Sequence, residues 1–170
     1  QRTLNTFLGV SAHLGPDSVD ADLVASAAHL YCEGYLWDRD EAKAAIRYAM
    51  DAARLARRTV SLTLSDSFCV ERHRAEWLDL LTDRVDVVFG NAGEVCSLFE
   101  VTDLDLAIQA LASEVELAFV TLGPRGSLAE GYREVNLLWR ECNSGSNTPW
   151  AVGPANFWPF HIFSCSGHSI

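Results

Sequence analysis

Residues 85–94, VDVVFGNAGE, decide the fold. The apolar run at 85–89 has the composition of a strand buried on both faces of a parallel sheet. Asn91 follows the run closely and Glu94 comes three residues later, which is the spacing of a helix capping box. The stretch therefore predicts a buried strand that passes directly into a helix over residues 91–98, as in a βαβ unit.

Strand-like and helix-like segments alternate on both sides of this stretch. Further strands are expected over residues 3–10, 30–35, 60–64, 117–122 and 127–130, and further helices over residues 18–30, 38–58, 70–84 and 103–113. Short strands separated by helices are typical of α/β proteins with a mostly parallel sheet that helices cover on both faces. Ligands bind beyond the carboxyl ends of such strands, so functional residues are expected just after Leu64, Phe89 and Thr121.

Polar residues precede three of the expected helices. Asp17 with Ser18 is expected to cap the helix over residues 18–30, and Asp38 with Glu41 has the spacing of a capping box before the longest helix. Asp66, between two serines, follows the strand over residues 60–64 at a possible ligand position. A cap for the next helix is the favoured interpretation of Asp66, because Ser and Asp are common at that place.

The composition describes one globular domain and excludes several classes of partner. The chain has 170 residues, 49% of them hydrophobic, and its 13 Lys+Arg against 23 Asp+Glu give a net charge of −10. Such an acidic chain is expected to repel nucleic acids. It contains no apolar run long enough to span a membrane and no secretory leader, and its five widely spaced cysteines favour reduced thiols. A cytoplasmic protein without a membrane partner is therefore expected.

The composition changes after Arg140. Residues 142–170 contain no Lys, Arg, Asp or Glu, but include three prolines and five large aromatic residues. We expect the domain to comprise residues 1–135 and regard residues 136–170 as a separate apolar tail. Two interpretations of the tail stay open, namely a segment that docks on a partner or on its own core, and a shifted reading frame. His161, Cys165 and His168 lie in this aperiodic segment, and we assign no metal to them.

Two loops at predicted strand ends carry residues suited to nucleotide binding. Asn91 and Glu94 project from the first turn of a helix, where a carboxylate can hold hydrated Mg²⁺ while an amide faces phosphate oxygens. The capping box alone would also explain this pair. Thr121 is followed by Gly123 and Gly126, and glycine permits positive φ angles and a close approach of a ligand to the backbone. An ordinary turn between two strands would explain these glycines equally well.

The segments in this order resemble the ribokinase-like (PfkB) carbohydrate kinase family, and most closely its bacterial adenosine-kinase-type members. The matching stretches are QRTLNTFLG (1–9), CEGYLWD (32–38), LTLSDSFCVERHR (62–74), VDVVFGNAGE (85–94) and VTLGPRGS (120–127). The resemblance covers about residues 1–131. It implies a ribokinase-like three-layer α/β sandwich with a mostly parallel central sheet, present here in incomplete form as the central part of the kinase domain.

The resemblance also implies a function and a set of site residues. Asn91 and Glu94 match the family's N-x-x-E element, which arranges phosphates and Mg²⁺ through water. Thr121, Gly123 and Gly126 match its nucleotide-contacting turn. The implied reaction transfers the γ-phosphoryl group of ATP, with Mg²⁺, to a hydroxyl of adenosine or a related nucleoside or sugar. A small-molecule substrate is thus the expected partner, and the exposed edges of an incomplete sheet are compatible with a homo-oligomer.

One family motif has no counterpart in the chain. Members of the family continue after the glycine turn into D-T-x-G-A-G-D, whose last aspartate is the catalytic base. The nearest stretch here is NTPWAVG (147–153), which lacks both aspartates. We therefore assign no catalytic residue and expect the activity of this chain to be impaired. The alternative is a non-catalytic module that binds a nucleotide or a partner.

Overall fold

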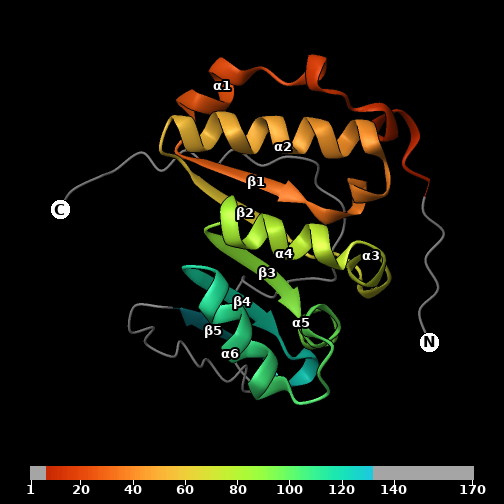
Figure 1. Ribbon diagram of the computed structural model, residues 1–170, viewed down its shortest axis with the longest axis vertical. Coiled ribbons are helices and arrows are strands. Elements are labelled where there is room, and N and C mark those ends of the chain that lie inside the picture. Colours follow the sequence, from red (N-terminus) through yellow and green to blue (C-terminus); the bar gives the residue numbers. More distant parts are fainter. Residues whose placement is uncertain (1–6, 132–170) are drawn as a thin grey trace, which may run out of the picture.

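The computed structural model describes residues 7–131 (Figure 1). The strands are β1 (His29–Glu33), β2 (Thr59–Thr63), β3 (Val87–Asn91), β4 (Leu117–Thr121) and β5 (Ser127–Gly131). The α-helices are α1 (Ala21–Ser26), α2 (Asp40–Leu55), α3 (Ser67–Arg72), α4 (Arg74–Asp83), α5 (Ala92–Phe99) and α6 (Leu104–Glu114). The 3₁₀-helices are η1 (Gly9–His13), η2 (Pro16–Ser18), η3 (Gly34–Asp38) and η4 (Gly123–Arg125).

The five strands form one sheet in the order β1-β2-β3-β4-β5. The first four strands are parallel, and β5 runs antiparallel beside β4 because only a short turn connects the two. The predicted α/β class and mostly parallel sheet are confirmed. Because the four parallel strands all end at the same edge of the sheet, the loops that follow them share that edge.

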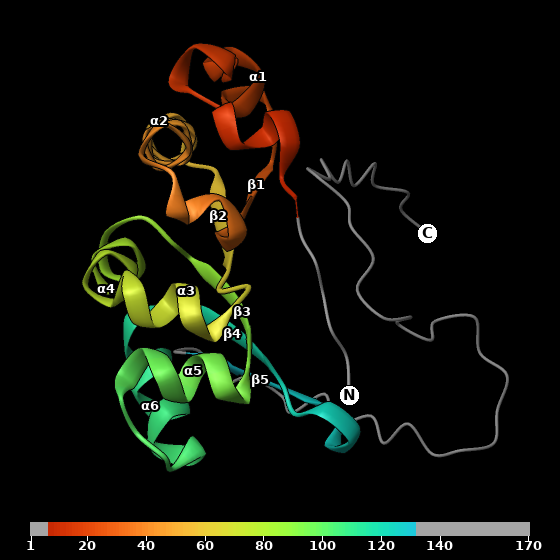
Figure 2. The same ribbon diagram turned by 90° about the vertical axis from the view of Figure 1, so that its right-hand side faces the viewer.

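The helices cover one face of the sheet within residues 7–131, whereas the sequence pattern predicts cover on both faces. Figure 2 shows α2 to α6 on the same side of the strands. The physical reason is the strand order. Each parallel connection is expected to be right-handed, and successive crossovers that all step in one direction place their helices on the same face.

The core lies between this helical layer and the sheet. Val60, Leu62 and Val88 point toward the helices and have no exposed surface. Two tryptophans fill the space near the carboxyl ends of β1 and β2, with the rings of Trp37 and Trp77 5.1 Å apart. On the other face Phe89 stacks on Phe119 at 5.1 Å. The strands therefore carry apolar side chains on both faces, which explains why their sequences lack a clear alternation.

Three details of the amino-terminal third differ from the predictions. Residues 3–6 of the predicted strand over 3–10 lie outside the described residues, and the end of that stretch lies in the 3₁₀-helix η1, which begins at Gly9 with a φ of +59°. Helix α1 starts later than predicted, since Asp20 caps it through the Leu23 N–H. Asp17 and Ser18 lie instead in η2.

The predicted capping box at the start of the longest helix is wrong. Helix α2 begins at Asp40, and its N-cap is Arg39, which makes no side-chain capping bond. Asp38 lies one residue too early and instead accepts hydrogen bonds from Arg72 and His73. The Arg72 guanidinium and the His73 imidazole thus bind the Asp38 carboxylate, which local spacing predicts to be a cap of α2.

The predicted helix over residues 70–84 is two helices. Asp66 caps α3 by accepting the Phe68 N–H at 2.7 Å, so the favoured capping interpretation is confirmed and the helix starts at Ser67. The helical hydrogen bonding is then interrupted at His73 before α4 begins.

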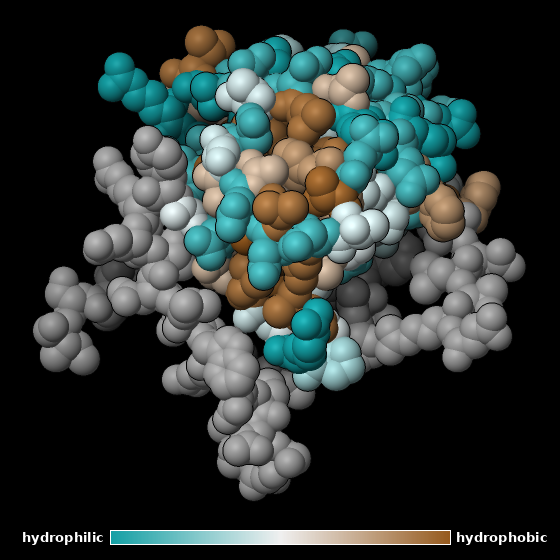
Figure 3. Space-filling view, turned by 60° about the horizontal axis from the view of Figure 1, so that its bottom comes forward, coloured by the Kyte–Doolittle hydropathy of each residue, from teal (hydrophilic) through white to brown (hydrophobic). Residues whose placement is uncertain are grey.

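None of the helices within residues 7–131 is long and apolar enough to cross a membrane. Apolar groups still gather in the middle of one face, among hydrophilic residues (Figure 3).

Candidate nucleotide site at the carboxyl edge of the sheet

The first loop of the candidate site joins β3 to α5. The Asn91 side-chain oxygen accepts the Glu94 N–H at 2.9 Å. In return, the two Glu94 oxygens accept the Asn91 N–H at 2.9 Å and the Asn91 side-chain amide at 2.6 Å. The predicted capping box is therefore confirmed. It fixes both side chains at the N-terminus of α5, where free N–H groups favour an anion.

Burial determines the chemistry of Glu94. The residue is 6% exposed, and burial raises the pKa of its carboxyl above the usual value. The negative charge of Asp66 raises this pKa further, whereas the hydrogen bond from the Asn91 backbone lowers it. A carboxylate that is short of solvent and lies near another carboxylate is stabilised by a cation, so Glu94 has the electrostatics of a metal-binding group.

The second loop joins β4 to β5. Thr121 ends β4 and is exposed, and the 3₁₀-helix η4 follows from Gly123. Gly123 and Gly126 have φ angles of +62° and +92°, and a β-carbon at either position would meet nothing within 4 Å. The glycines are therefore required by the backbone conformation and not by crowding. The space above the turn is open to a ligand.

The sheet brings the two predicted loops together. Asn91 of β3 pairs with Thr121 of β4 in the parallel register, so the capping box and the glycine turn follow neighbouring strand ends. This juxtaposition was expected from the sequence and is present in the structure. It places an amide, a buried carboxylate, a hydroxyl and an exposed glycine turn along one edge.

A third part of this edge was not identified from the sequence. Glu33 ends β1, and its carboxylate contacts the Tyr31 hydroxyl at 3.3 Å and the Ser65 hydroxyl at 3.4 Å. Burial raises the pKa of Glu33, and burial together with the Glu33 charge raises the pKa of Tyr31 to about 12. The sequence signal was present, because Glu33 is an acidic residue at the end of an apolar strand. The predicted strand extends to residue 35, so the sequence pattern places Glu33 within the strand and not at its end.

Tyr35 connects the strand ends electrostatically. It lies in η3 and is 52% exposed. Burial and the charges of Glu94, Glu33 and Asp66, in that order, raise the pKa of its hydroxyl. The Tyr35 hydroxyl therefore lies within the field of three carboxylates that follow three different strands. The carboxyl edge of the sheet is an acidic site with an aromatic side chain above it.

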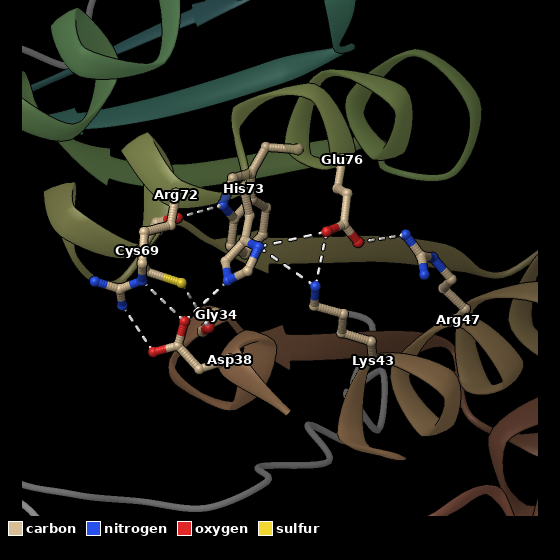
Figure 4. A network of polar contacts seen from close by, with 9 residues as sticks. Gly34, Asp38, Lys43, Arg47, Cys69, Arg72, His73 and Glu76 are labelled. Carbon is tan, nitrogen blue, oxygen red and sulfur yellow. Dashed lines mark hydrogen bonds and ion pairs between the residues drawn. The ribbon is translucent and has the colours of Figure 1, made fainter. Parts of the chain in front are cut away.

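A separate group of possible metal ligands joins η3 to α3 (Figure 4). One ligand atom from each of Asp38, Cys69 and His73 lies within 4.8 Å of the other two. Arg72 already binds both oxygens of Asp38, and His73 Nε2 donates to the same carboxylate at 2.9 Å. Burial raises the pKa of the Cys69 thiol to about 11, so the thiolate that a metal requires is scarce. We interpret the group as an ion-pair network.

Several solved structures are similar to this chain. The chain is similar to the adenosine kinase from Sinorhizobium meliloti, with 45% identity and a TM-score of 0.70, over 72% of this chain and 38% of that one. A sugar kinase protein from Rhizobium etli CFN 42 gives 44% identity, the same TM-score and the same coverage. A protein described as Ribokinase II from E. coli, in complex with ATP and Mg²⁺, shares 18% identity with a TM-score of 0.65, which supports the fold alone. No protein-family model and no curated protein sequence matches the chain.

These likenesses confirm the resemblance drawn from the sequence. Over the matched part, the chain is similar to ribokinase-like (PfkB) kinases, and its strand order and helical layer have the fold of that family. At 44–45% identity it is most like bacterial sugar and adenosine kinases among the structures named above. The chain spans only 38% of the length of these two relatives.

Some of the sequence-based assignments lie outside the described residues. The stretch at 147–153, the tail over residues 136–170 and the candidate ligands His161, Cys165 and His168 all belong to this group. Within the described residues, Cys32, Cys69 and Cys96 are free thiols.

Proposed function

We propose that this chain carries the ATP–Mg²⁺ side of a kinase that phosphorylates a hydroxyl of adenosine or of a related nucleoside or sugar. The observation that supports the proposal is the placement of the Asn91–Glu94 box beside the Thr121–Gly126 turn on neighbouring strand ends. The likeness to bacterial adenosine and sugar kinases at 44–45% identity supports the same reaction class.

The two loops divide the work of holding a triphosphate. Phosphoryl transfer depends mainly on positioning and on neutralising charge. Glu94 would hold Mg²⁺ through water, and Asn91 would orient the phosphates around the ion. Thr121 and the backbone N–H groups of the glycine turn would contact phosphate oxygens. The exposed Arg125 of the turn adds a positive charge close to this position.

The acceptor side of the site favours a nucleoside over a free sugar. Two large aromatic residues near the carboxyl ends of β1 and β2 are exposed, Tyr35 by 52% and Phe68 by 70%. Aromatic faces stack on nucleobases, a contact that a free sugar cannot make in the same way. Glu33 and Ser65 offer hydrogen-bonding groups for a ribose hydroxyl at the same edge. We therefore propose adenosine as the acceptor to be tested first.

A second function is favoured by the missing motif. The stretch nearest to D-T-x-G-A-G-D in this sequence lacks its aspartates, and we assign no residue as the base. Mg²⁺-dependent ATP binding without turnover is the behaviour expected of a non-catalytic nucleotide-binding module. This outcome would keep the proposed nucleotide site and remove the proposed catalysis.

The test measures binding and turnover of the full chain separately. ATP titrations with and without Mg²⁺ report the nucleotide site, and ATP-dependent phosphorylation of adenosine and ribose reports catalysis. Gly126→Val should abolish nucleotide binding because valine cannot adopt a φ of +92° without strain. Gly15→Ala is the control, since Gly15 has a φ of −108° and open space around it. ATP binding that ignores Mg²⁺ and survives Gly126→Val would overturn both proposed functions.

A further inference from the structure

Two short helices stand on the acceptor side of the proposed site. The 3₁₀-helix η3 follows β1 and carries Tyr35, and α3 follows the end of β2 and carries Phe68. They have five and six residues, respectively. Helices this short are not stable alone, so tertiary contacts must hold both in place.

The first contact between them lies next to the strand ends. The Gly34 N–H donates to the Ser65 hydroxyl at 3.0 Å, and the Cys69 thiol lies 3.7 Å from the Gly34 carbonyl oxygen. A β-carbon at Gly34 would come within 2.6 Å of the Thr63 carbonyl oxygen, so only glycine allows this approach. The amino-terminal ends of η3 and α3 are thereby joined at the edge of the sheet.

The second contact lies at the opposite ends of the same two helices (Figure 4). Asp38, the last residue of η3, accepts bonds from Arg72 Nη2 at 2.7 Å and Arg72 Nε at 3.2 Å, and lies 2.9 Å from His73 Nε2. Partial burial opposes ionisation of Asp38, but the bonds from Arg72 and His73 outweigh it and hold its pKa below the usual value. Arg72 ends α3 and His73 follows it directly.

His73 connects this contact to the body of the domain. Its Nδ1 atom lies 3.4 Å from Glu76 Oε1 and 3.3 Å from Lys43 Nζ. Glu76 of α4 also pairs with Lys43 at 2.7 Å and with Arg47 at 2.8 Å, both on α2. The ends of η3 and α3 are therefore fixed relative to two longer helices that pack on the sheet.

Asp38 binds Arg72 and His73 instead of capping α2. It precedes α2 by two residues, yet α2 begins without any side-chain cap. A side-chain cap contributes about 1 kcal/mol to a helix, and a half-exposed ion pair contributes no more than that. The stability of α2 alone does not explain the arrangement, whereas fixing η3 to α3 does.

We propose that Asp38, Arg72 and His73 are positioning residues that clasp η3 to α3 and thereby hold Tyr35 and Phe68 for the acceptor. This inference rests on the proposed nucleoside acceptor. The three residues act through the two helices, and among residues 7–131 no hydrogen bond or ion pair joins them to the loops after β3 and β4 that are proposed to bind ATP. Loosening the clasp therefore weakens acceptor binding and leaves the affinity for ATP–Mg²⁺ unchanged.

The test combines Asp38→Asn with a matched control. Asp51→Asn removes a similar partly exposed ion pair, in which Asp51 lies 2.9 Å from Arg84 Nε outside the site. Amide hydrogen exchange at Gly34 and Phe68 reports the clasp in the free protein, and titrations report the affinities for adenosine and for ATP–Mg²⁺. For Asp38→Asn we expect exchange at both amides to rise about tenfold. The dissociation constant for adenosine should rise about fivefold, with ATP–Mg²⁺ binding unchanged.

Each outcome distinguishes the clasp from the acceptor assignment. Unchanged exchange in Asp38→Asn would overturn the clasp, and faster exchange with unaltered adenosine affinity would overturn its role in positioning the acceptor. An equal effect of Asp51→Asn would also overturn it, because any lost ion pair would then suffice. His73→Gln, whose amide can still donate to Asp38, should behave more like the native chain than His73→Ala. If exchange responds but the native chain does not bind adenosine, the proposed acceptor fails and the clasp of the free protein stands.

Discussion

Replacing Glu94 by glutamine separates the two roles that the β3–α5 loop combines. In the native chain both carboxylate oxygens accept hydrogen bonds from Asn91, one from its backbone N–H and one from its side-chain amide. Glutamine keeps one oxygen and presents an NH₂ group to the second donor. The capping box would then retain one of these two bonds, and the charge that Mg²⁺ requires would be gone.

The magnitude follows from two opposing effects. Losing a hydrogen bond to a charged group costs about 1.5–3 kcal/mol. The neutral amide recovers part of this, because the native carboxylate is buried and its pKa is raised by desolvation. We therefore expect Glu94→Gln to lower the free energy of unfolding by about 1–2 kcal/mol. The affinity for ATP–Mg²⁺ should fall by about tenfold or more, while the weaker affinity for ATP without Mg²⁺ should change little.

The assay pairs denaturant unfolding with ATP titrations at zero and saturating Mg²⁺. Asp103→Ala is the matched control, because Asp103 caps α6 by accepting the Asp105 N–H at 2.9 Å and the Leu106 N–H at 3.3 Å. It should lose about 1 kcal/mol of stability and keep native nucleotide binding. If Glu94→Gln loses stability but retains the full Mg²⁺ dependence, Glu94 is a helix cap and nothing more.

Three further predictions concern the fold. Gly34→Ala should lower the free energy of unfolding by about 1–3 kcal/mol in denaturant titrations, since its β-carbon would lie 2.6 Å from a backbone oxygen; no loss would show that the loop adjusts freely. Leu62→Ala in the core should lower the free energy of unfolding by about 2–5 kcal/mol. Leu55→Ala, at an exposed position, should change this free energy by no more than about 0.5 kcal/mol. Equal losses of stability in the two variants would contradict the assigned core. The pKa of Asp38 is depressed, so its stabilisation is present at neutral pH and is lost as pH falls through that pKa. The native chain and Asp38→Asn should accordingly converge in stability in acid, and a gap that persists there would refute the ionic origin of the clasp.

The elements that the sequence predicts correctly are those whose signal is local. The run over residues 85–89 and the following Asn91 and Glu94 lie within ten residues of one another, and the structure forms the strand, the cap and the helix with shifts of one or two residues. The β4–β5 turn is also predicted correctly, because the glycines at positions 123 and 126 indicate positive φ angles by themselves. Such features need no knowledge of the remaining chain.

The errors have a common cause, which is competition from residues distant in sequence. Asp38 has the spacing of a helix cap, but its carboxylate instead accepts a hydrogen bond from Arg72, which lies 34 residues further along the chain. Glu33 looks like an ordinary strand residue until the sheet places Ser65 beside it, 32 residues further along. Strand order is likewise not readable from the periodicity of any single strand. The Asn91–Glu94 loop and the Thr121–Gly126 turn could be predicted to lie side by side only because parallel strands share a carboxyl edge.

The acidity of this edge constrains how a triphosphate can bind there. Glu33, Asp66 and Glu94 influence the same Tyr35 hydroxyl, so their negative charges lie close to the proposed nucleotide position. ATP without a cation would bring further negative charge to a region that already contains three carboxylates, and the repulsion in a partly buried site is several times that in water. Bound Mg²⁺ would reverse the sign of the interaction, because the carboxylates would then attract the ion that the phosphates carry. We therefore expect the proposed nucleotide site to depend on a divalent cation.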